Sequence, residues 1–375
     1  MPLDSLEFRT SFQKLLVGLI LILVPLTVFG VYVALQGDSH IRQVNGESFR
    51  SLTLTAADST SEFIAGCVKD VSVIANTPGP VEAVALANRQ YEHLSEEAIR
   101  NKVDAIDKSW ESSETDGLSA KILTSDLARQ LRRVRELNPK LLKITVADVT
   151  GATVSATDRP AHYFQSDRES WQALSSGGRG ALHVSDLRYD DQSRLYYVSI
   201  AYPILQEGTG RFVGAVTAMA DVSPLFAQLN RRQMGRTGRL FLVGEDGTVI
   251  EAPGVTPAMK VKSEEYAAIR DAMGSLRGRE AGYIFAMLPN GESYLIGFAD
   301  TGLKEAYPNL PWIVLASQEA REVTGPVRNM TAFAFLLMIL ALLMLSLLAA
   351  HVFLHRKQEL EDIETPEDKA PPAAA

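Results

Sequence analysis

The sequence predicts an α+β protein in which two antiparallel-sheet modules follow a long helix, with an apolar span on either side. Two long apolar blocks lie near the ends of the chain, at 15–35 and 332–354. Between them, short runs of apolar residues are separated by Gly, Asp and Ser clusters, a pattern typical of strands in a sheet. The beginning of that region instead repeats its apolar residues at helical spacing.

Each apolar block is long enough to cross a membrane. The block at 15–35 contains no charged residue and, at about 1.5 Å per residue, spans a hydrocarbon core of about 30 Å. A cleaved signal peptide is the alternative, but the block is longer than such a leader and no clear small-residue cleavage site follows it. In the block at 332–354, only Ser346 and His351 interrupt the apolar residues. We therefore expect two transmembrane helices.

The two end segments, 1–14 and 355–375, are too short to fold around a core of their own. Two spans place both ends on the same side of the membrane, so we expect two short cytoplasmic ends and no cytoplasmic catalytic domain. The last residues are rich in Pro and Ala and are expected to be disordered. The large region 38–327 is then expected to lie outside the cytoplasm.

The composition excludes several classes of function. A net charge of -8, without any Lys/Arg cluster, argues against nucleic-acid binding. The single cysteine, Cys67, excludes a disulfide framework within the chain and a thiolate metal cluster. The histidines show no pair at metal-ligand spacing except His351 and His355 at the end of the second apolar block, and no serine lies in a Gly-x-Ser-x-Gly motif. We expect no catalytic residues, no metal and no cofactor.

Residues 39–75 are predicted to form one long helix that ends before Pro78. The apolar residues, Cys67 among them, keep an approximate three-four spacing and give one apolar stripe. This stripe either packs on its own domain or forms the seam of a homodimer, and we expect the chain to be a homodimer. Three shorter helices are predicted to follow: 81–89, 95–110 and 118–138.

Two sheet modules are predicted after these helices, one within 38–225 and the other within 226–327. The first begins with a strand near Leu141 and ends with strands at 195–204 and 212–221. The second contains Asp246-Gly247 and Asn290-Gly291, which are strong hairpin signals, and a last strand at 312–316. Each module opens with an apolar strand, a turn containing Asp and Gly, and a second apolar strand.

Candidate ligand-binding residues lie between and within the strands of the first module: Tyr163, Arg168, Trp171, Asp186, Tyr197 and Asp221. The planar fork of the arginine suits a carboxylate, and the tryptophan ring can stack on a ligand. The aspartates can receive an ammonium group, and each tyrosine offers a hydroxyl. Together these groups would bind a small organic acid or a zwitterion.

Structural alternatives exist for three of these residues. Arg168 can form a surface ion pair with a neighbouring carboxylate, and Trp171 can be a core residue. Asp221 can cap a helix that begins near Ser223, because an aspartate just before a helix accepts its free amides.

The order of these motifs resembles the double Cache family of extracellular sensor domains, which are tandem PAS-like folds on a long first helix. The resemblance covers about 38–327 and rests on three stretches: Asn138-Pro139 to Val154, Asp167-Arg168 to Ser185-Asp186, and Pro203-Ile204 to Asp221. It implies a membrane-distal module within 38–225 that holds a small-molecule pocket, a membrane-proximal module at 226–327, and signalling through the spans.

The resulting expectation is a two-span sensor in the bacterial plasma (inner) membrane, with its large domain outside the cytoplasm. Because no output domain follows the second span, the signal would pass in trans to a separate signalling protein. A non-sensing envelope assembly or scaffold protein, with two spans and a large outer domain, is the alternative. A sensor whose pocket has decayed, and which keeps only dimerisation and partner contact, is a third.

Overall fold

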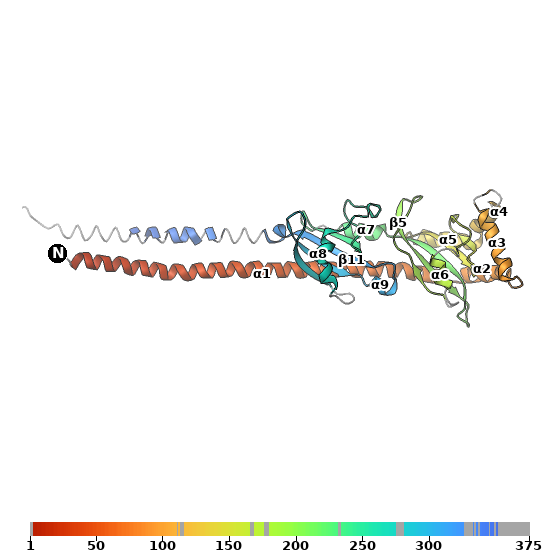
Figure 1. The fold of residues 1–375 in the computed structure, drawn as a ribbon, viewed down its shortest axis with the longest axis horizontal. Helices are drawn as coiled ribbons and strands as arrows, with labels where there is room; N and C mark the ends of the chain where they lie inside the picture. Colours follow the sequence, from red (N-terminus) through yellow and green to blue (C-terminus); the bar gives the residue numbers. More distant parts are fainter. Residues whose placement is uncertain are drawn as a thin grey trace, which may run out of the picture. The chain divides into compact units, whose positions relative to one another are not determined.

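The computed structural model describes residues 3–110, 112, 116–165, 169–175, 180–231, 234–274 and 281–325, together with parts of 333–351. The chain divides into two units, one formed by residues 46–319 and the other by residues 1–45 and 320–375 (Figure 1). Both sheets belong to the 46–319 unit.

Helix α1 (Leu3–Ala75) is continuous and contributes to both units. Residues 320–325 are also helical. Among the residues that the structure describes, no helix includes a stretch both long and apolar enough to cross a membrane. About a third of the predicted span at 332–354 and the whole of the tail at 355–375 lie outside the described residues.

The first sheet, which we call the distal sheet, is antiparallel and has the order β2-β1-β6-β5-β3, with β4 paired to β5. Its strands are β1 (Leu141–Asp148), β2 (Thr153–Ala156), β3 (His183–Val184), β4 (Arg188–Asp190), β5 (Leu195–Leu205) and β6 (Phe212–Asp221). The alternation of buried and half-buried residues along β6 gives the sheet two distinct faces.

The second sheet, which we call the proximal sheet, is also antiparallel and has the order β8-β7-β11-β10-β9. Its strands are β7 (Arg239–Gly244), β8 (Val249–Glu251), β9 (Ala281–Met287), β10 (Ser293–Asp300) and β11 (Trp312–Glu319). The predicted hairpins at Asp246-Gly247 and Asn290-Gly291 are confirmed. The last strand is longer than the predicted 312–316, because its pairing with β10 continues to Glu319.

Four helices precede the distal sheet: α2 (Pro78–Arg89), α3 (Glu96–Lys108), α4 (Asp116–Thr124) and α5 (Asp126–Leu137). Helix α2 packs on one face of the sheet, where Val84 lies against Gly214 of β6. The single helix predicted at 118–138 was wrong, because Ser125 interrupts it. The Ser125 hydroxyl accepts a hydrogen bond from the Ala128 N–H at 3.1 Å, which makes Ser125 the N-cap of a new helix. Helix α6 (Glu169–Ser175) packs on the opposite face of the sheet.

The apolar stripe of α1 packs on its own domain, as one of the two predicted alternatives requires. Ile64, Cys67 and Val71 are all fully buried within the chain. Gly297 of β10 lies against the backbone of α1, where an added Cβ would come within 2.9 Å of the Phe49 carbonyl oxygen. The homodimer stays a prediction.

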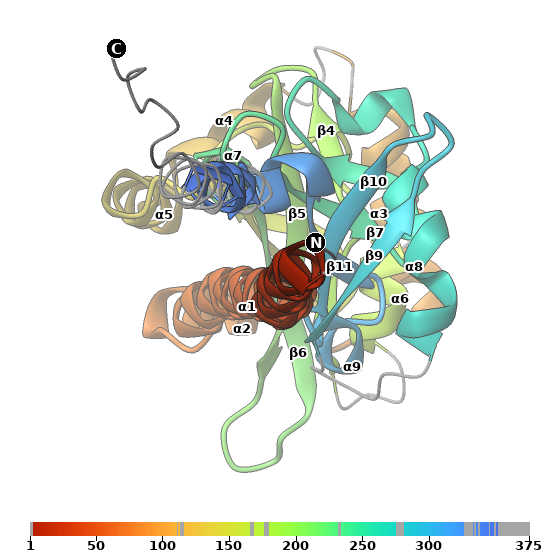
Figure 2. The same ribbon diagram turned by 90° about the vertical axis from the view of Figure 1, so that its left-hand side faces the viewer.

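We define the proximal module as the proximal sheet with its helices α8 (Glu264–Gly274) and α9 (Leu303–Ala306). Its core is apolar. Tyr266 and Ile269 of α8 pack against Phe241, Phe298 and neighbouring side chains of the sheet. In Figure 2 the proximal strands separate α8 from α1. Helix α7 (Ser223–Asn230) connects the two sheets, and a short 3-10 helix, η3 (Pro257–Met259), follows β8.

Candidate ligand-binding site

A cavity of about 230 Å³ lies in the distal module, which we define as the distal sheet with helices α2 to α6. Its walls come from four strands and from the loop that follows β2. Six of the lining residues carry the argument below: Lys143, Thr145, Arg188, Tyr197, Ser199 and Thr217.

The strand register explains why these side chains meet. Thr217 of β6 pairs with Thr145 of β1 on one side and with Ala201 of β5 on the other. Directly paired residues of neighbouring strands point to the same face of the sheet, as do residues two apart along one strand. Ser199 and Tyr197 therefore share this face, which is also the face that α6 covers. The cavity lies beside α6 on this face.

Hydroxyl groups line the cavity without partners. The side-chain hydroxyls of Thr145, Tyr197, Ser199 and Thr217 make no hydrogen bond within the described part of the chain. All four residues are half-buried. Half-buried hydroxyls without a protein partner are available to water or to a polar ligand, so this wall is suited to a polar ligand.

Lys143 and Asp190 form an ion pair at one end of the cavity. The Lys143 Nζ lies 3.0 Å and 3.1 Å from the two carboxylate oxygens of Asp190. Burial raises the pKa of Asp190, but hydrogen bonds from Ser193 and Lys143 outweigh it, so this pKa lies below its usual value. The carboxylate is therefore ionised at neutral pH and already satisfied by protein donors.

The remaining charged side chains of the wall differ in how they are paired. Asp158 accepts a hydrogen bond from Arg135 at 2.7 Å. Arg159 pairs with Asp116 at 3.3 Å. Arg188 is exposed and has no ion pair or hydrogen bond to its side chain among the residues that the structure describes. The wall thus holds three cations against two carboxylates, and Arg188 is the cation in excess.

The structure places the predicted site residues in different surroundings. Tyr197 lines the distal cavity. Tyr163 is buried, with its ring 5.4 Å from the ring of Trp110, and burial raises the pKa of its hydroxyl to about 12. Trp171 of α6 is buried against residues of the distal sheet, with its ring 5.5 Å from that of Phe212.

Asp221 and Asp186 do not line this cavity, and neither do Tyr163 and Trp171. Asp221 accepts a hydrogen bond from the Ser223 N–H at 2.8 Å at the start of α7, in agreement with the capping alternative. Arg168 lies outside the described residues. Asp186 is exposed and lines a separate cavity. Their roles in binding stay predictions.

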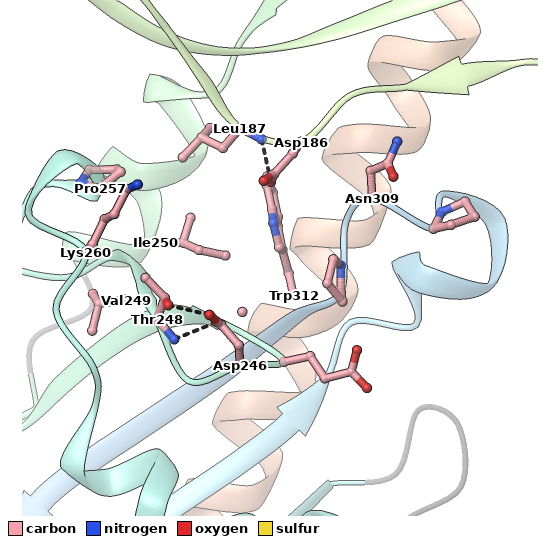
Figure 3. Close-up of a pocket in the computed structure, with 14 residues that line it drawn as sticks. Asp186, Leu187, Asp246, Thr248, Val249, Ile250, Pro257, Lys260, Asn309 and Trp312 are labelled. Atoms are coloured by element: carbon pink, nitrogen blue, oxygen red, sulfur yellow. Dashed lines mark hydrogen bonds between the residues drawn. The ribbon is translucent and has the colours of Figure 1, made fainter. Parts of the chain in front are cut away.

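The separate cavity, of about 800 Å³, lies between the two sheet modules (Figure 3). Asp186 accepts a hydrogen bond from the N–H of Leu187 at 2.7 Å. On the opposite wall, the Asp246 carboxylate accepts hydrogen bonds from the N–H and the hydroxyl of Thr248 and from the ammonium group of Lys262. The wall of this wide cavity carries three carboxylates, of Asp186, Glu245 and Asp246, against the single ammonium group of Lys260, so it lacks the excess of cations found at the distal cavity.

A family model described as Cache domain matches residues 38–327, which is most of the chain. This chain belongs to the double Cache family. No curated protein matches it significantly.

Several solved structures resemble this Cache domain. The sensory domain of the Campylobacter jejuni chemoreceptor Tlp3 (CcmL) has 11% sequence identity and a TM-score of 0.50, over 76% of this chain and 98% of that chain. The ligand-binding domain of the Pseudomonas aeruginosa PAO1 amino acid chemoreceptor PctC, in complex with GABA, has 14% identity and a TM-score of 0.44, over 71% and 96%. At this level of identity the Tlp3 similarity supports the fold alone.

Sequence reasoning missed most of the cavity wall of the Cache domain. Lys143, Thr145, Arg188 and Ser199 were not recognised as site residues. One signal was available: β1, β5 and β6 each place a hydroxyl among apolar residues, at Thr145, Ser199 and Thr217. Only the register between the strands shows that these hydroxyls share one face and one cavity.

Proposed function

We propose that this Cache chain is a membrane-anchored, extracytoplasmic sensor whose distal cavity binds a small molecule that carries a carboxylate. The observation that carries the proposal is the cavity wall itself. Four hydroxyls without partners and the unpaired Arg188 line a cavity of about 230 Å³, in the part of the chain that the structure describes. A wall with one cation in excess favours an anionic group, and the hydroxyls add hydrogen bonds to it.

The size and chemistry of the cavity support a small organic acid or a zwitterion. The guanidinium of Arg188 can form two parallel hydrogen bonds with a carboxylate, which would fix its orientation. Tyr197, the cross-strand neighbour of Arg188, can donate a third hydrogen bond. The cavity is smaller than most sites for drug-sized ligands, so the ligand is expected to have few non-hydrogen atoms.

Thermal unfolding of the full-length chain tests the proposal directly. The purified protein would be screened against monocarboxylic acids, dicarboxylic acids, hydroxy acids and α-amino acids. A ligand present at 100 times its Kd should stabilise the folded state by about 2.7 kcal/mol and raise the Tm. If no carboxylate in the panel changes the Tm or gives heat in a calorimetric titration, the receptor function is wrong.

Membrane anchoring and the extracytoplasmic position are the second part of the proposal. The apolar blocks at 15–35 and 332–354 support it, because each has the length and composition of a span. Protease added to intact cells should cleave within 38–327, and a tag at either terminus should be reached only after lysis. Cleavage of 38–327 only after lysis would contradict this arrangement.

Signalling in trans is the third part. A ligand can change a separate partner only if it binds one arrangement of the sensor more tightly than another. We expect a dimer in detergent and a cytoplasmic or membrane partner that is captured by cross-linking in intact cells, in a ligand-dependent amount. A large ring that binds no acid would instead favour the scaffold alternative.

A further inference from the structure

The two sheets can be aligned residue by residue from their hydrogen bonds. In each module the first hairpin closes with the same two backbone bonds. The N–H of residue i donates to the carbonyl of i+4, and the N–H of i+3 donates to the carbonyl of i, where i is Asp148 in β1 and Gly244 in β7. The residue at i+3 is a glycine with positive φ in both hairpins. Asp148 therefore corresponds to Gly244.

The strand pairings extend this alignment across both sheets. It places the Tyr197–Asp221 pair of the distal sheet on the Tyr294–Glu319 pair of the proximal sheet. Both pairs join a tyrosine to a carboxylate across the same two strands. This agreement in residue type supports the alignment independently of the hairpins.

The aligned positions explain why the distal module has a cavity on this face and the proximal module has a core. The three hydroxyl positions on β1, β5 and β6 are occupied in the proximal sheet by large apolar side chains: Phe241, Ile296 and Leu315. Each of these is almost completely buried. Apolar side chains thus fill the space that corresponds to the distal cavity.

One polar position remains at the end of this filled space. Arg239 corresponds to Lys143 of the distal cavity, and its strand neighbour is Ser317. The carboxylate of Glu265, from the first turn of α8, occupies this position, and the Glu265 side chain is 2% exposed. One carboxylate oxygen accepts hydrogen bonds from Arg239 and from the Ser317 hydroxyl at 3.0 Å, and the other accepts one from Ser263 at 3.0 Å.

We propose that Glu265 is a tethered ligand of the proximal module. Its carboxylate occupies an anion site formed by Arg239, Ser263 and Ser317, on the face where the distal module keeps an open cavity. The proximal module is therefore held in an occupied arrangement, and ligand-dependent change is confined to the distal module. When the Glu265 side chain is removed, the vacated site accepts a small free monocarboxylate such as acetate.

The proposal differs from an ordinary buried ion pair in one measurable respect. Loss of either partner is destabilising in both cases: without Arg239 the buried Glu265 carboxylate loses its cation, and without Glu265 the half-exposed Arg239 and the Ser317 and Ser263 hydroxyls lose their acceptor. Only a site with donors held in place by the sheet and the helix end can bind a carboxylate that is no longer attached to the chain. The removed CH₂–COO⁻ group and acetate have nearly the same volume, so Glu265→Ala leaves the space that acetate needs.

The test is thermal unfolding of the full-length Glu265→Ala variant in increasing sodium acetate at constant ionic strength. We expect a lowered Tm that acetate restores in large part, whereas sodium chloride and neutral acetamide do not. The double variant Arg239→Ala/Glu265→Ala should show no recovery. Glu265→Gln, which fills the space with a neutral amide, should also be destabilised and should not respond to acetate.

The neighbouring Glu264 supplies the matched control. It lies in the same first turn of α8 but is exposed, so Glu264→Ala removes the same charge from the same helix end. Its Tm should be independent of acetate. A folded Glu265→Ala protein whose Tm does not respond to acetate would overturn the proposal. If this variant does not fold, the yield of soluble protein refolded with and without acetate replaces the Tm, and equal yields would also overturn it.

Discussion

Tyr197 of β5 and Arg188 of β4 are direct cross-strand partners, and both line the distal cavity. Neither side chain has a hydrogen-bond partner among the described residues. The cavity therefore combines a cation with a hydroxyl on adjacent strands. This pair is the part of the wall on which the proposed recognition of a carboxylate depends most.

Replacing Arg188 with alanine should weaken binding of any acid that stabilises the wild type by about 10- to 100-fold. A hydrogen bond to a charged group contributes about 1.5–3 kcal/mol, and a tenfold change in Kd is about 1.4 kcal/mol. Calorimetric titration of both proteins measures the change. Arg211→Ala is the control, because Arg211 is exposed in the same module and does not line the cavity. Equal loss in both variants would contradict a specific role for Arg188.

Replacing Thr217 with leucine should close the distal cavity. The aligned residue of the proximal sheet is Leu315, which is fully buried in the apolar core. We expect the affinity for the acid to fall by at least about tenfold. The Tm should stay the same or rise, because the added CH groups fill space in the cavity and each buried CH₂ stabilises the folded state by about 0.8 kcal/mol. Unchanged binding would show that the ligand lies elsewhere. Val213→Leu on the same strand is the control.

Asp148 should be important for stability rather than for binding. This buried carboxylate accepts hydrogen bonds from the Tyr91 hydroxyl at 2.9 Å, from the Thr150 N–H at 2.9 Å and from the Ala152 N–H at 3.2 Å. Asp148→Ala leaves these donors unsatisfied, at about 1–3 kcal/mol for each buried group. We expect a loss of about 3 kcal/mol in the free energy of unfolding by urea. Tyr91→Phe removes one of these hydrogen bonds and should lower the free energy of unfolding by about 1 kcal/mol. If both variants lost the same free energy of unfolding, the proposed role of the Asp148 hydrogen bonds would be wrong.

The Asp246–Lys262 pair should make stability depend on pH in acid. The hydrogen bond from Lys262, with those from Thr248, lowers the pKa of Asp246 to about 2. An unfolded aspartate titrates near about 3.9, so the pair stabilises the fold above about pH 4 and loses this effect as the pH falls toward about 2. Both side chains are more than half exposed, so the contribution is about 0.2–1 kcal/mol and decreases with salt.

Unfolding of Lys262→Met between about pH 2 and pH 6 measures this contribution. The variant should lose stability at about pH 6 and show a flatter dependence below about pH 4. Lys260→Met is the control, because Lys260 is exposed nearby and has no side-chain partner within the described chain. Identical pH profiles for both variants and the wild type would contradict the expected linkage.

Features coded by neighbouring residues were predictable. The Asp246-Gly247 and Asn290-Gly291 hairpins are confirmed, because a glycine that accepts positive φ determines such a turn locally. The helical spacing of 39–75 likewise predicted a helix, now part of α1. The failure at Ser125 has the same local origin, since a serine inside an apolar-periodic stretch is compatible with both a helix interior and an N-cap.

The alternating and helical patterns of the sequence by themselves determined many of the elements and the two sheet modules, and the order of the motifs determined the Cache family. Each of these follows from residues close together in the chain or from their order. The tertiary structure decided which side chains line the distal cavity. Thr145, Arg188 and Thr217 come from strands far apart in sequence, and their meeting depends on a register that no local pattern fixes. The same register decided that Glu265, and not a solute, fills the corresponding anion position of the proximal sheet.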